Sequence, residues 1–276
     1  MNKRINVVVI QKKFKLNHGC VSDQVVNHIE KSKIKKSSIV VLHELVLSRY
    51  FPITKLSKYD HYVTDINDLD IEKIQSICKK LSIFLVLPIF ENGYKNENYN
   101  TALVIDDKGM IIGKQRKVSI PNENCYFEKH YFTPSSSFKV FKIRNVKIGV
   151  LICWDQWFPE NYKKLHNLGA DIIISPTAIG HVYKKNKLIS LRNEKKKWEM
   201  VIKTNSLLIN TPVIVANRCD IEKRGENVLK FWGSSFVTNS DGDIIERANK
   251  NNMILSVSIN TDNKRKSVKK WGFLTK

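Results

Sequence analysis

Short runs of consecutive apolar residues recur along this chain, and segments with helical spacing lie between several of them. Such runs are typical of strands that are buried on both faces of a sheet. The first half predicts strands at Ile5–Gln11, Ile39–Leu42 and Ile83–Phe90, with helices at Val21–Lys35 and around Ile71–Leu81. This is the order of successive β-α-β units.

Hairpins enter the pattern after residue 100. Ala102–Ile105 and Ile111–Arg116 flank an Asp/Gly turn, which supplies the φ > 0 positions of a tight reversal. Phe138–Ile143 and Val146–Ile152 form a second predicted hairpin. The remaining predicted elements are a helix at Asn161–Leu168, a strand at Asp171–Ile174 that feeds the loop SPTAIGH, an amphipathic helix at Arg192–Asn210, and strands at Val213–Ala216, Phe231–Thr238, Ile244–Ala248 and Met253–Ile259.

Units of this mixed kind predict an α/β fold with two sheets packed against each other. Each sheet needs cover on its outer face, so helices lie on both outsides in a four-layer α-β-β-α sandwich. A length of 276 residues suits a single domain over residues 1–276. The basic tail from about residue 264 is expected to be peripheral.

The composition narrows the class of protein. Hydrophobic residues make up 42% and charged residues 26%, which is globular and argues against disorder. No apolar run approaches the roughly 20 residues that span a bilayer, and the apolar start is too short for a signal peptide. The five cysteines include no C-x-x-C pair, so they fit neither a disulfide framework nor a zinc site. We therefore expect a cytoplasmic protein without membrane association.

The net charge of +21 is the most unusual bulk property. Lysine-rich surfaces bind phosphate backbones without regard to sequence, so a polyanion partner has to be weighed. The lysines are spread over the whole chain, however, and no basic run carries the interleaved aromatic residues of a nucleic-acid module. We expect no nucleic-acid partner, and a catalytically idle nucleic-acid-binding protein remains the alternative from a different class.

Three reactive side chains follow directly after predicted strands, namely Glu44, Lys117 and Cys153. The ends of strands are where α/β folds place their chemistry. Cys153 falls at a sharp strand-to-helix junction, which exposes a nucleophile and leaves the backbone N–H of Trp154 free to face an oxyanion. The alternative for Cys153 is a buried cysteine that packs as a small hydrophobe.

Together these three groups can perform nucleophilic catalysis. Glu44 can take the thiol proton and return it to a leaving amine, as a general base and acid. Lys117 can hold Cys153 as a thiolate and stabilise an oxyanion. Taken singly, Glu44 and Lys117 are more often surface or capping residues. A Cys-His site with His43, His130 or His181 lacks the local signatures of cysteine proteases.

Several separated strings in this sequence match one known family. VVLHELVLSRYF, GKQRKVSIPNENCYFEKHYFTPS, GVLICWDQWFPE, SPTAIG and FWGSSFVTNSDGDII occur in the order of the nitrilase, or carbon–nitrogen hydrolase, superfamily, which the chain resembles from Ile5 to Leu274. CWDQWFPE and PTAIG are most similar to the N-carbamoylputrescine amidases of that family. The resemblance implies the four-layer fold, a Glu44, Lys117, Cys153 triad, and Glu128 as a further acid that orients the lysine and the substrate.

The resemblance also implies the reaction, which is hydrolysis of a non-peptide C–N bond through a cysteine thioester without metal or organic cofactor. The expected substrate is N-carbamoylputrescine, giving putrescine, carbon dioxide and ammonia, as in polyamine biosynthesis. Another small amide or ureido acid, as for a β-ureidopropionase or an aliphatic amidase, is the alternative. Relatives pair through helices equivalent to Arg192–Asn210, so a homodimer or higher homo-oligomer is expected.

A cationic substrate needs a carboxylate away from Cys153 and apolar walls for its carbon chain. The candidate acids are Asp155, Glu160 and Glu194, and the candidate walls are Trp154, Trp157, Tyr131 and Phe132. For each, capping or core packing is an equal alternative. An anionic substrate would instead select Arg192 or Lys187. Departures from the family occur at His43, where proline is usual, and at Asn205 and Ile209–Asn210; the C-terminal KKWGFLTK also stops early.

Overall fold

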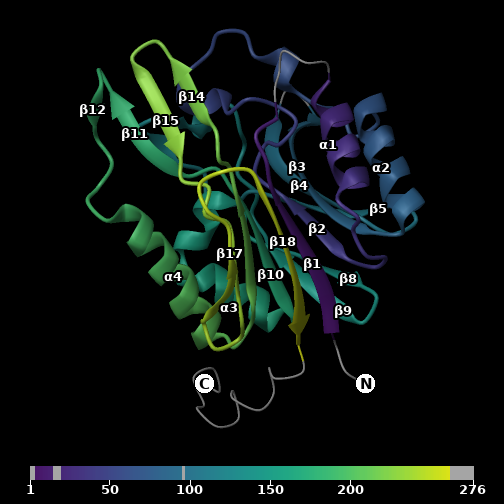
Figure 1. Ribbon diagram of the computed structural model, residues 1–276. Helices are drawn as coiled ribbons and strands as arrows, with labels where there is room; N and C mark the ends of the chain where they lie inside the picture. Colours follow the sequence, from purple (N-terminus) through teal and green to yellow (C-terminus); the bar gives the residue numbers. More distant parts are fainter. Residues whose placement is uncertain (1–3, 15–19, 95–96, 262–276) are drawn as a thin grey trace.

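The computed structural model describes residues 4–14, 20–94 and 97–261, and two six-stranded sheets form its centre (Figure 1). The first sheet has the strand order β18-β1-β2-β3-β4-β5. Its strands β1, β2 and β3 run parallel, as β-α-β units require, and the others pair antiparallel. The strands are β1 (Arg4–Gln11), β2 (Ile39–Leu42), β3 (Phe84–Asn92), β4 (Asn98–Ile105), β5 (Ile111–Arg116) and β18 (Met253–Asn260).

The second sheet has the order β17-β16-β13-β10-β9-β8, with β9, β10 and β13 parallel at its centre. Its outer strands pair antiparallel with their neighbours. The strands are β8 (Val140–Ile143), β9 (Val146–Val150), β10 (Ile172–Thr177), β13 (Val213–Asn217), β16 (Phe236–Thr238) and β17 (Ile244–Arg247).

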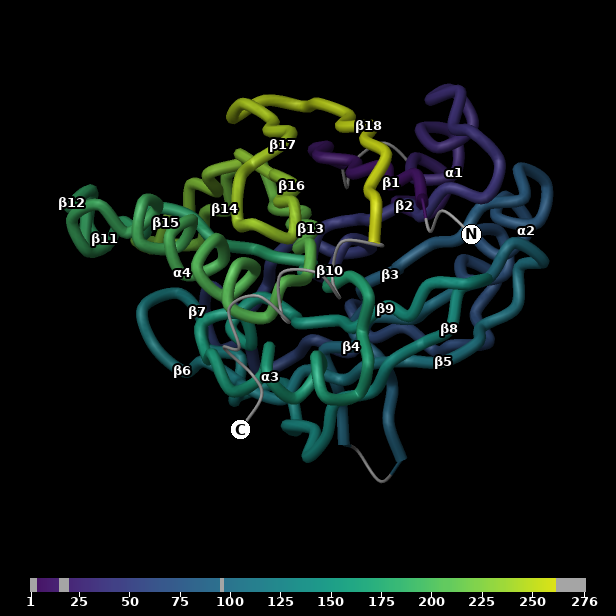
Figure 2. The backbone as a smooth tube through the Cα atoms, turned by 90° about the horizontal axis from the view of Figure 1, so that it is seen from below, coloured from purple at the N-terminus to yellow at the C-terminus, as the bar shows by residue number. Residues whose placement is uncertain are grey.

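Alternation along the strands divides the core into layers. In β1, Val7 and Val9 face the second sheet, whereas Val8 and Ile10 face helices α1 (Val21–Lys31) and α2 (Leu69–Leu81). The outer face of the second sheet packs against α3 (Pro159–Asn167) and α4 (Glu194–Leu208), with Trp198 fully buried. Figure 2 shows the two helix pairs on opposite sides of the sheets. The predicted four-layer α-β-β-α sandwich is confirmed.

The predicted elements differ from the structure mainly between β10 and β16. Part of the SPTAIGH loop is strand, because β10 continues to Thr177 and β11 (Gly180–Lys184) begins three residues later. The strand predicted from Phe231 begins at Phe236. Phe231 instead ends β15 in a further four-stranded sheet, with the order β12-β11-β15-β14, that the sequence did not predict. Its other strands are β12 (Lys187–Leu188), β14 (Ile221–Arg224) and β15 (Asn227–Phe231).

That four-stranded sheet is hidden in the sequence because its strands are short and polar. In β14, Glu222 is buried while Ile221, Lys223 and Arg224 are exposed, which reverses the usual pattern. The predicted loop at 118–137 likewise contains a small hairpin, β6 (Asn122–Glu123) with β7 (Tyr126–Phe127). Short 3₁₀ segments complete the described elements, at Phe51–Ile53 (η1), Asp60–Tyr62 (η2), Glu128–His130 (η4) and Cys153–Trp157 (η5).

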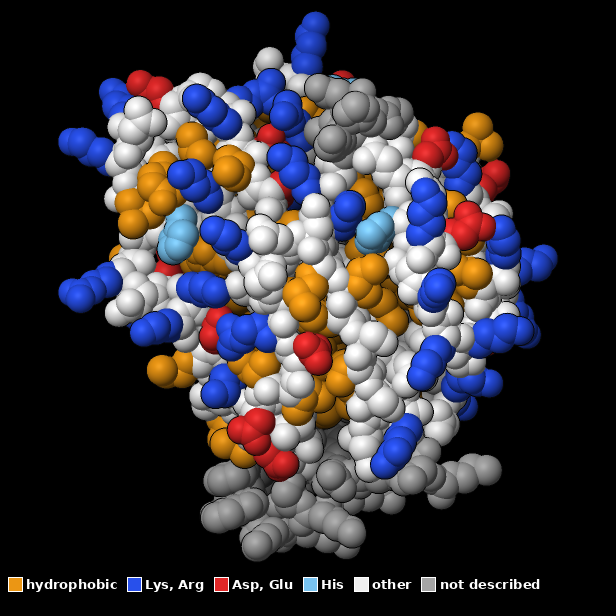
Figure 3. Space-filling model, in the orientation of Figure 1, with side chains coloured by type: hydrophobic (Ala, Val, Ile, Leu, Met, Phe, Trp, Pro, Cys, Tyr) orange, Lys and Arg blue, Asp and Glu red, His pale blue; other side chains and the backbone are white. Residues whose placement is uncertain are grey.

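The surface carries its positive charge in a dispersed form. Figure 3 shows lysine and arginine side chains scattered over the whole visible face, with acidic side chains between them. Within the described residues, no helix combines the length and the apolar character needed to cross a membrane. The basic tail predicted from residue 264, with its KKWGFLTK end, lies outside the described residues.

Candidate active site

Three strand ends bring Glu44, Lys117 and Cys153 together between the two sheets. Glu44 follows β2 and Lys117 follows β5, both in the first sheet, while Cys153 follows β9 in the second. Cys153 is the first residue of η5 and has φ +47°, so the chain turns sharply there, as expected of a nucleophile elbow. Burial is nearly complete, with 0% exposure for Glu44 and Lys117 and 4% for Cys153.

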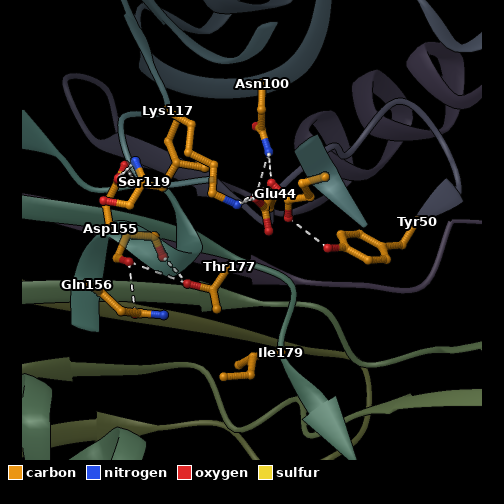
Figure 4. A network of polar contacts seen from close by, with 12 residues as sticks. Glu44, Tyr50, Asn100, Lys117, Ser119, Asp155, Gln156, Thr177 and Ile179 are labelled. Carbon is orange, nitrogen blue, oxygen red and sulfur yellow. Dashed lines mark hydrogen bonds and ion pairs between the residues drawn. The ribbon is translucent and has the colours of Figure 1, made fainter. Parts of the chain in front are cut away.

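Lys117 lies between two carboxylates. Its Nζ donates to Oε1 of Glu44 at 2.8 Å and to Oε2 of Glu128 at 2.6 Å. The amide of Asn100 donates to the same Glu44 oxygen at 2.7 Å, and the hydroxyl of Tyr50 donates to Oε1 of Glu128 at 2.7 Å. Figure 4 shows Lys117, Asn100 and Tyr50 directed at this cluster from different segments. The cluster therefore fixes the amino group from several sides.

The cluster contains one more carboxylate than ammonium. Burial opposes the charge on Lys117, but Glu128 and Glu44 outweigh it and raise the pKa of the amino group. Burial raises the pKa of Glu128 to about 7, and Glu44 adds to this rise, while Lys117 and Tyr50 oppose it. Lys117 therefore stays charged, whereas Glu128 titrates near neutral pH.

The charge state of Cys153 differs from the sequence-based expectation that Lys117 holds it as a thiolate. Burial and the neighbouring Glu44 carboxylate raise the pKa of the thiol well above its usual range. Lys117 and the backbone N–H of Ala178 act in the opposite direction without reversing the shift. Cys153 therefore rests as a thiol, because the ammonium is already engaged by two carboxylates. Attack on a substrate then requires a base that removes the proton.

Glu44 has the free oxygen that such a base needs. Its Oε1 is occupied by Lys117 and Asn100, but its buried Oε2 has no hydrogen-bond partner among the described residues. A buried carboxylate oxygen without a donor is costly, and functional sites are where such groups persist. This oxygen can accept the Cys153 proton and later deliver it to a leaving amine.

Asp155 joins the elbow to the loop after Lys117. Its carboxylate accepts hydrogen bonds from the backbone N–H groups of Ser119 at 2.6 Å, Val118 at 3.2 Å and Ile152 at 3.0 Å. The side chain is fully buried, and burial raises its pKa to about 6 despite these donors. Figure 4 shows Asp155 beside Ser119. This geometry argues against the substrate-binding role predicted for Asp155 and gives it a positioning role.

The predicted aromatic walls fall into two groups. Tyr131 and Phe132 are 4% exposed and pack on Phe51, and the Tyr131 hydroxyl donates to the carbonyl of Thr54. They form part of a core beneath the site. Trp154 and Trp157 are instead half-buried, with ring centroids 6.0 Å apart. Trp157 packs against the core between the second sheet and helices α3 and α4, and its indole N–H is buried without a partner among the described residues. A substrate contact for this pair stays a prediction.

Among the predicted acids, Glu194 is half-buried and Glu160 is exposed. Burial raises the pKa of Glu194, while the Leu191 N–H, the Ser190 hydroxyl and the nearby cation Lys197 partly offset this. Cys153 and Glu194 both add to the burial-driven rise in the pKa of Tyr126, so both lie near its hydroxyl. Arg192 and Lys187, the candidates for an anionic substrate, are exposed.

Sequence reasoning missed the neutral members of the site. Asn100, Tyr50 and the Ala178 N–H each touch a reactive group, yet none lies beside one in sequence. Tyr50 lies in the RYFP loop and Ala178 in the PTAIG string, but residues of these types are common in loops. Only the tertiary contacts single them out. The described residues contain no group of three or more His, Cys, Asp or Glu side chains placed to bind a metal ion.

The departures from the family lie beside the site or behind it. His43 is buried, with its ring nitrogens 3.1 Å from the carbonyl oxygen of Glu44 and 3.2 Å from that of Lys12. Asn205 donates to Val201 within α4, and Asn210 donates to the carbonyl of Ser240. Within the described part of the chain, none of these side chains is hydrogen-bonded to Lys117 or Cys153.

Comparison with known proteins agrees with this geometry. The family model for "Carbon-nitrogen hydrolase" matches residues 19–266. The N-carbamoylputrescine amidase of Oryza sativa subsp. japonica is 32% identical over 251 residues, which cover 88% of this chain and 82% of the relative. The citrullinase of Francisella tularensis subsp. tularensis is 33% identical over 248 residues, which cover 89% of this chain and 85% of the relative.

A solved structure extends the likeness to three dimensions. The carbon–nitrogen hydrolase from Helicobacter pylori G27 superposes with a TM-score of 0.87 and 27% sequence identity, covering 99% of this chain and 95% of that chain. The family model, the relatives and the sandwich thus lead to one conclusion, which confirms the resemblance seen in the sequence. The chain belongs to the carbon–nitrogen hydrolase family, within the nitrilase superfamily.

Proposed function

We propose that the protein hydrolyses N-carbamoylputrescine through a thioester on Cys153. The observation that carries the proposal is the buried cluster of Glu44, Lys117 and Glu128 beside a cysteine at a sharp elbow. A thiol, a carboxylate with a free oxygen and a fixed ammonium are the nucleophile, the base and the oxyanion donor that amide hydrolysis needs.

The reaction proceeds in two halves. Glu44 takes the proton as the Cys153 sulfur attacks the carbonyl carbon, and Lys117 with the Trp154 N–H stabilises the oxyanion. Trp154 is the second residue of η5, where a helical segment leaves N–H groups without internal partners. Glu44 then protonates the leaving amine. A water molecule, deprotonated by Glu44, cleaves the thioester, and the carbamic acid that results breaks down to amine and carbon dioxide.

The substrate is argued from charge. N-carbamoylputrescine ends in an ammonium, and Glu194 is a half-buried carboxylate near Tyr126. Its hydrogen-bond donors are neutral, and Lys197 is a cation in its neighbourhood. The half-buried rings of Trp154 and Trp157 suit its four-carbon chain. The rice relative, an N-carbamoylputrescine amidase, is consistent with this choice.

Hydrolysis of a ureido amino acid is the second candidate, and the likeness to the Francisella citrullinase favours it. Citrulline carries both an ammonium and a carboxylate at the end opposite its ureido group. Glu194 would bind the ammonium, and the exposed cations Arg192 or Lys187 would bind the carboxylate. Citrulline therefore belongs beside N-carbamoylputrescine in every substrate comparison.

We also propose that the protein is a homodimer that pairs through α4. Trp198 and Ile202 of this helix are buried in the subunit, but Met200 and Leu207 on its outer side are 65% and 43% exposed. They line a surface hollow of about 400 Å³ together with residues of the β16–β17 turn, including Gly242. Charged side chains of both signs, Lys196, Glu199, Lys203, Asp241 and Asp243, surround these two apolar residues. An apolar centre with a charged rim suits an isologous contact between two copies.

The triad predicts sharp losses of activity. Cys153→Ala removes the nucleophile and is expected to abolish turnover, and Glu44→Gln and Lys117→Ala should each remove most of it. Lys117→Ala also leaves buried carboxylates unpaired, which costs about 3–5 kcal/mol of unfolding free energy. Ammonia release, measured beside urea denaturation, checks both effects. Near wild-type turnover by Cys153→Ala would contradict the mechanism.

The pKa of about 7 at Glu128 predicts a pH dependence. Below pH 7 this carboxyl binds a proton, so a negative charge that orients Lys117 is lost and turnover is expected to fall. Above pH 7 the charge returns and turnover rises to a plateau. A pH–rate profile checks this, with Glu128→Gln as the comparison. The Glu128→Gln variant should turn over slowly, and its rate should show no change near pH 7. A change of rate near pH 7 in this variant would assign the titration to another group.

Glu194 predicts selectivity for a cationic substrate. Glu194→Gln is expected to raise KM for N-carbamoylputrescine about tenfold, the size of one charge-assisted hydrogen bond, and to leave an aliphatic amide unaffected. Glu160→Gln, which changes an exposed acid on α3, is the matched control. Ammonia release is compared on N-carbamoylputrescine, citrulline, N-carbamoyl-β-alanine and the amide. Preference for N-carbamoyl-β-alanine would overturn the assignment.

The dimer predicts a particle of twice the chain mass of 32.0 kDa in light scattering at micromolar concentration. Charges introduced by Met200→Glu with Leu207→Glu should yield monomers, because they would be buried at the contact. Leu69→Glu is the control, since Leu69 is 73% exposed on α2, on the opposite side of the molecule. A monomeric wild-type protein, or a dimer unaffected by the α4 changes, would refute this arrangement.

A further inference from the structure

We propose that Arg218 is a positioning residue whose buried guanidinium holds the backbone of residues 44–48, so that the Glu44 carboxylate is kept beside Cys153. The inference rests on the amidohydrolase function proposed above. Arg218 follows β13 of the second sheet, whereas residues 44–48 follow β2 of the first sheet. A side chain that joins them therefore fixes the base, carried by one sheet, relative to the nucleophile, carried by the other.

The Arg218 side chain donates four hydrogen bonds to backbone carbonyl oxygens of this loop. Its Nη1 donates to those of Glu44 at 3.5 Å, Leu45 at 3.4 Å and Ser48 at 3.2 Å, and its Nη2 donates to Ser48 at 3.3 Å. A guanidinium presents five N–H donors in a fixed plane, so one side chain can bind several carbonyl groups at once. Arg218 is 4% exposed, which keeps water from competing for these oxygens.

A carboxylate on the same segment, that of Asp220, stabilises the buried positive charge of Arg218. Asp220 accepts from Nε of Arg218 at 3.3 Å and from Nη2 at 3.2 Å. Burial opposes the charge on both groups. The attraction between the two charges outweighs this effect, so the pKa of Arg218 is raised and the pKa of Asp220 is lowered. The pair therefore presents a fixed, charged donor to the loop.

The loop needs such a donor because its backbone is strained. Leu45 has φ +50°, a left-handed conformation that costs a residue with a side chain about 1–2 kcal/mol. Arg218 binds the carbonyl groups of Glu44 and Leu45, which flank the reversal. Loss of these bonds would let the reversal relax, and it would move the Glu44 side chain away from its place between Lys117 and the thiol.

The far end of the loop is held by the same segment of the chain. Glu222, two residues beyond Asp220, accepts from the backbone N–H of Tyr50 at 3.2 Å and pairs with Arg49 at 3.0 Å. Tyr50 in turn donates to Glu128. Residues 218–222 thus hold both the general base and the residue that supports Glu128.

The test measures alkylation of Cys153 by iodoacetamide, which needs no substrate, with ammonia release measured in parallel. Because the Glu44 carboxylate raises the pKa of the Cys153 thiol, alkylation at pH 8 should be faster in Glu44→Gln than in the wild type. Arg218→Ala is expected to lower kcat about tenfold to a hundredfold, as for a misplacement of about 1 Å, with KM changed less than about twofold. Its alkylation rate should rise toward that of Glu44→Gln, because the carboxylate has moved away from the thiol. Mass spectrometry of the peptide that contains Cys153 distinguishes alkylation of this residue from alkylation of the other cysteines.

Two measurements distinguish positioning from a structural role. Guanidinium ion at millimolar concentration should bring the alkylation rate of Arg218→Ala part of the way back to that of the wild type. In the Glu44→Gln background, Arg218→Ala should cause no further change in the alkylation rate, because the two residues act through one group. Arg247→Ala is the matched control, since Arg247 also bonds a carboxylate, that of Glu199, but belongs to β17, away from the loop.

The outcomes separate this inference from the proposed function. If the wild type hydrolyses none of the substrates, the proposed function fails, yet faster alkylation in Arg218→Ala still supports the role of Arg218. An unchanged alkylation rate in Arg218→Ala, or a further change in the Glu44→Gln background, overturns that role. Should Arg218→Ala not fold, Arg218→Lys replaces it, because lysine keeps the charge without the planar fork; a wild-type rate there also refutes the inference.

Discussion

The buried ammonium of Lys117, held between Glu44 and Glu128, is the constraint on which the rest of the structure depends. Removing charges from water costs several kcal/mol for each ion, and only close pairing with further hydrogen bonds offsets that cost. Asn100 and Tyr50 supply these bonds from two other segments. The cluster therefore forms only when both strand ends and both loops are in place.

The excess negative charge of this cluster decides how the nucleophile works. Burial and the Glu44 carboxylate raise the pKa of the Cys153 thiol, and Lys117, which is engaged by two carboxylates, does not reverse this shift. In the proposed mechanism the proton therefore moves to Glu44 during attack, and Lys117 remains a fixed positive charge for the oxyanion.

The two-sheet architecture supplies the precision that such proton transfer needs. Asn217, the last residue of β13, and Arg218, which follows it, reach opposite parts of the site. Asn217 bonds both the N–H and the carbonyl of Ile179, next to the Ala178 N–H that faces the sulfur. Arg218 bonds the loop of Glu44. One strand end of the second sheet thus aligns parts of both sheets around Cys153.

The sequence by itself determined the sandwich, the parallel strands and the ends that carry Glu44, Lys117 and Cys153, because long apolar runs and the residues after them are local signals. It did not determine the small sheet that contains β14 and β15, because β14 buries the charged Glu222 and exposes Ile221. Only the tertiary structure decided that Asp155 binds backbone amides, that Cys153 rests as a thiol and that Arg218 reaches Glu44. These properties arise from burial and from contacts between residues far apart in the chain, which no local pattern records.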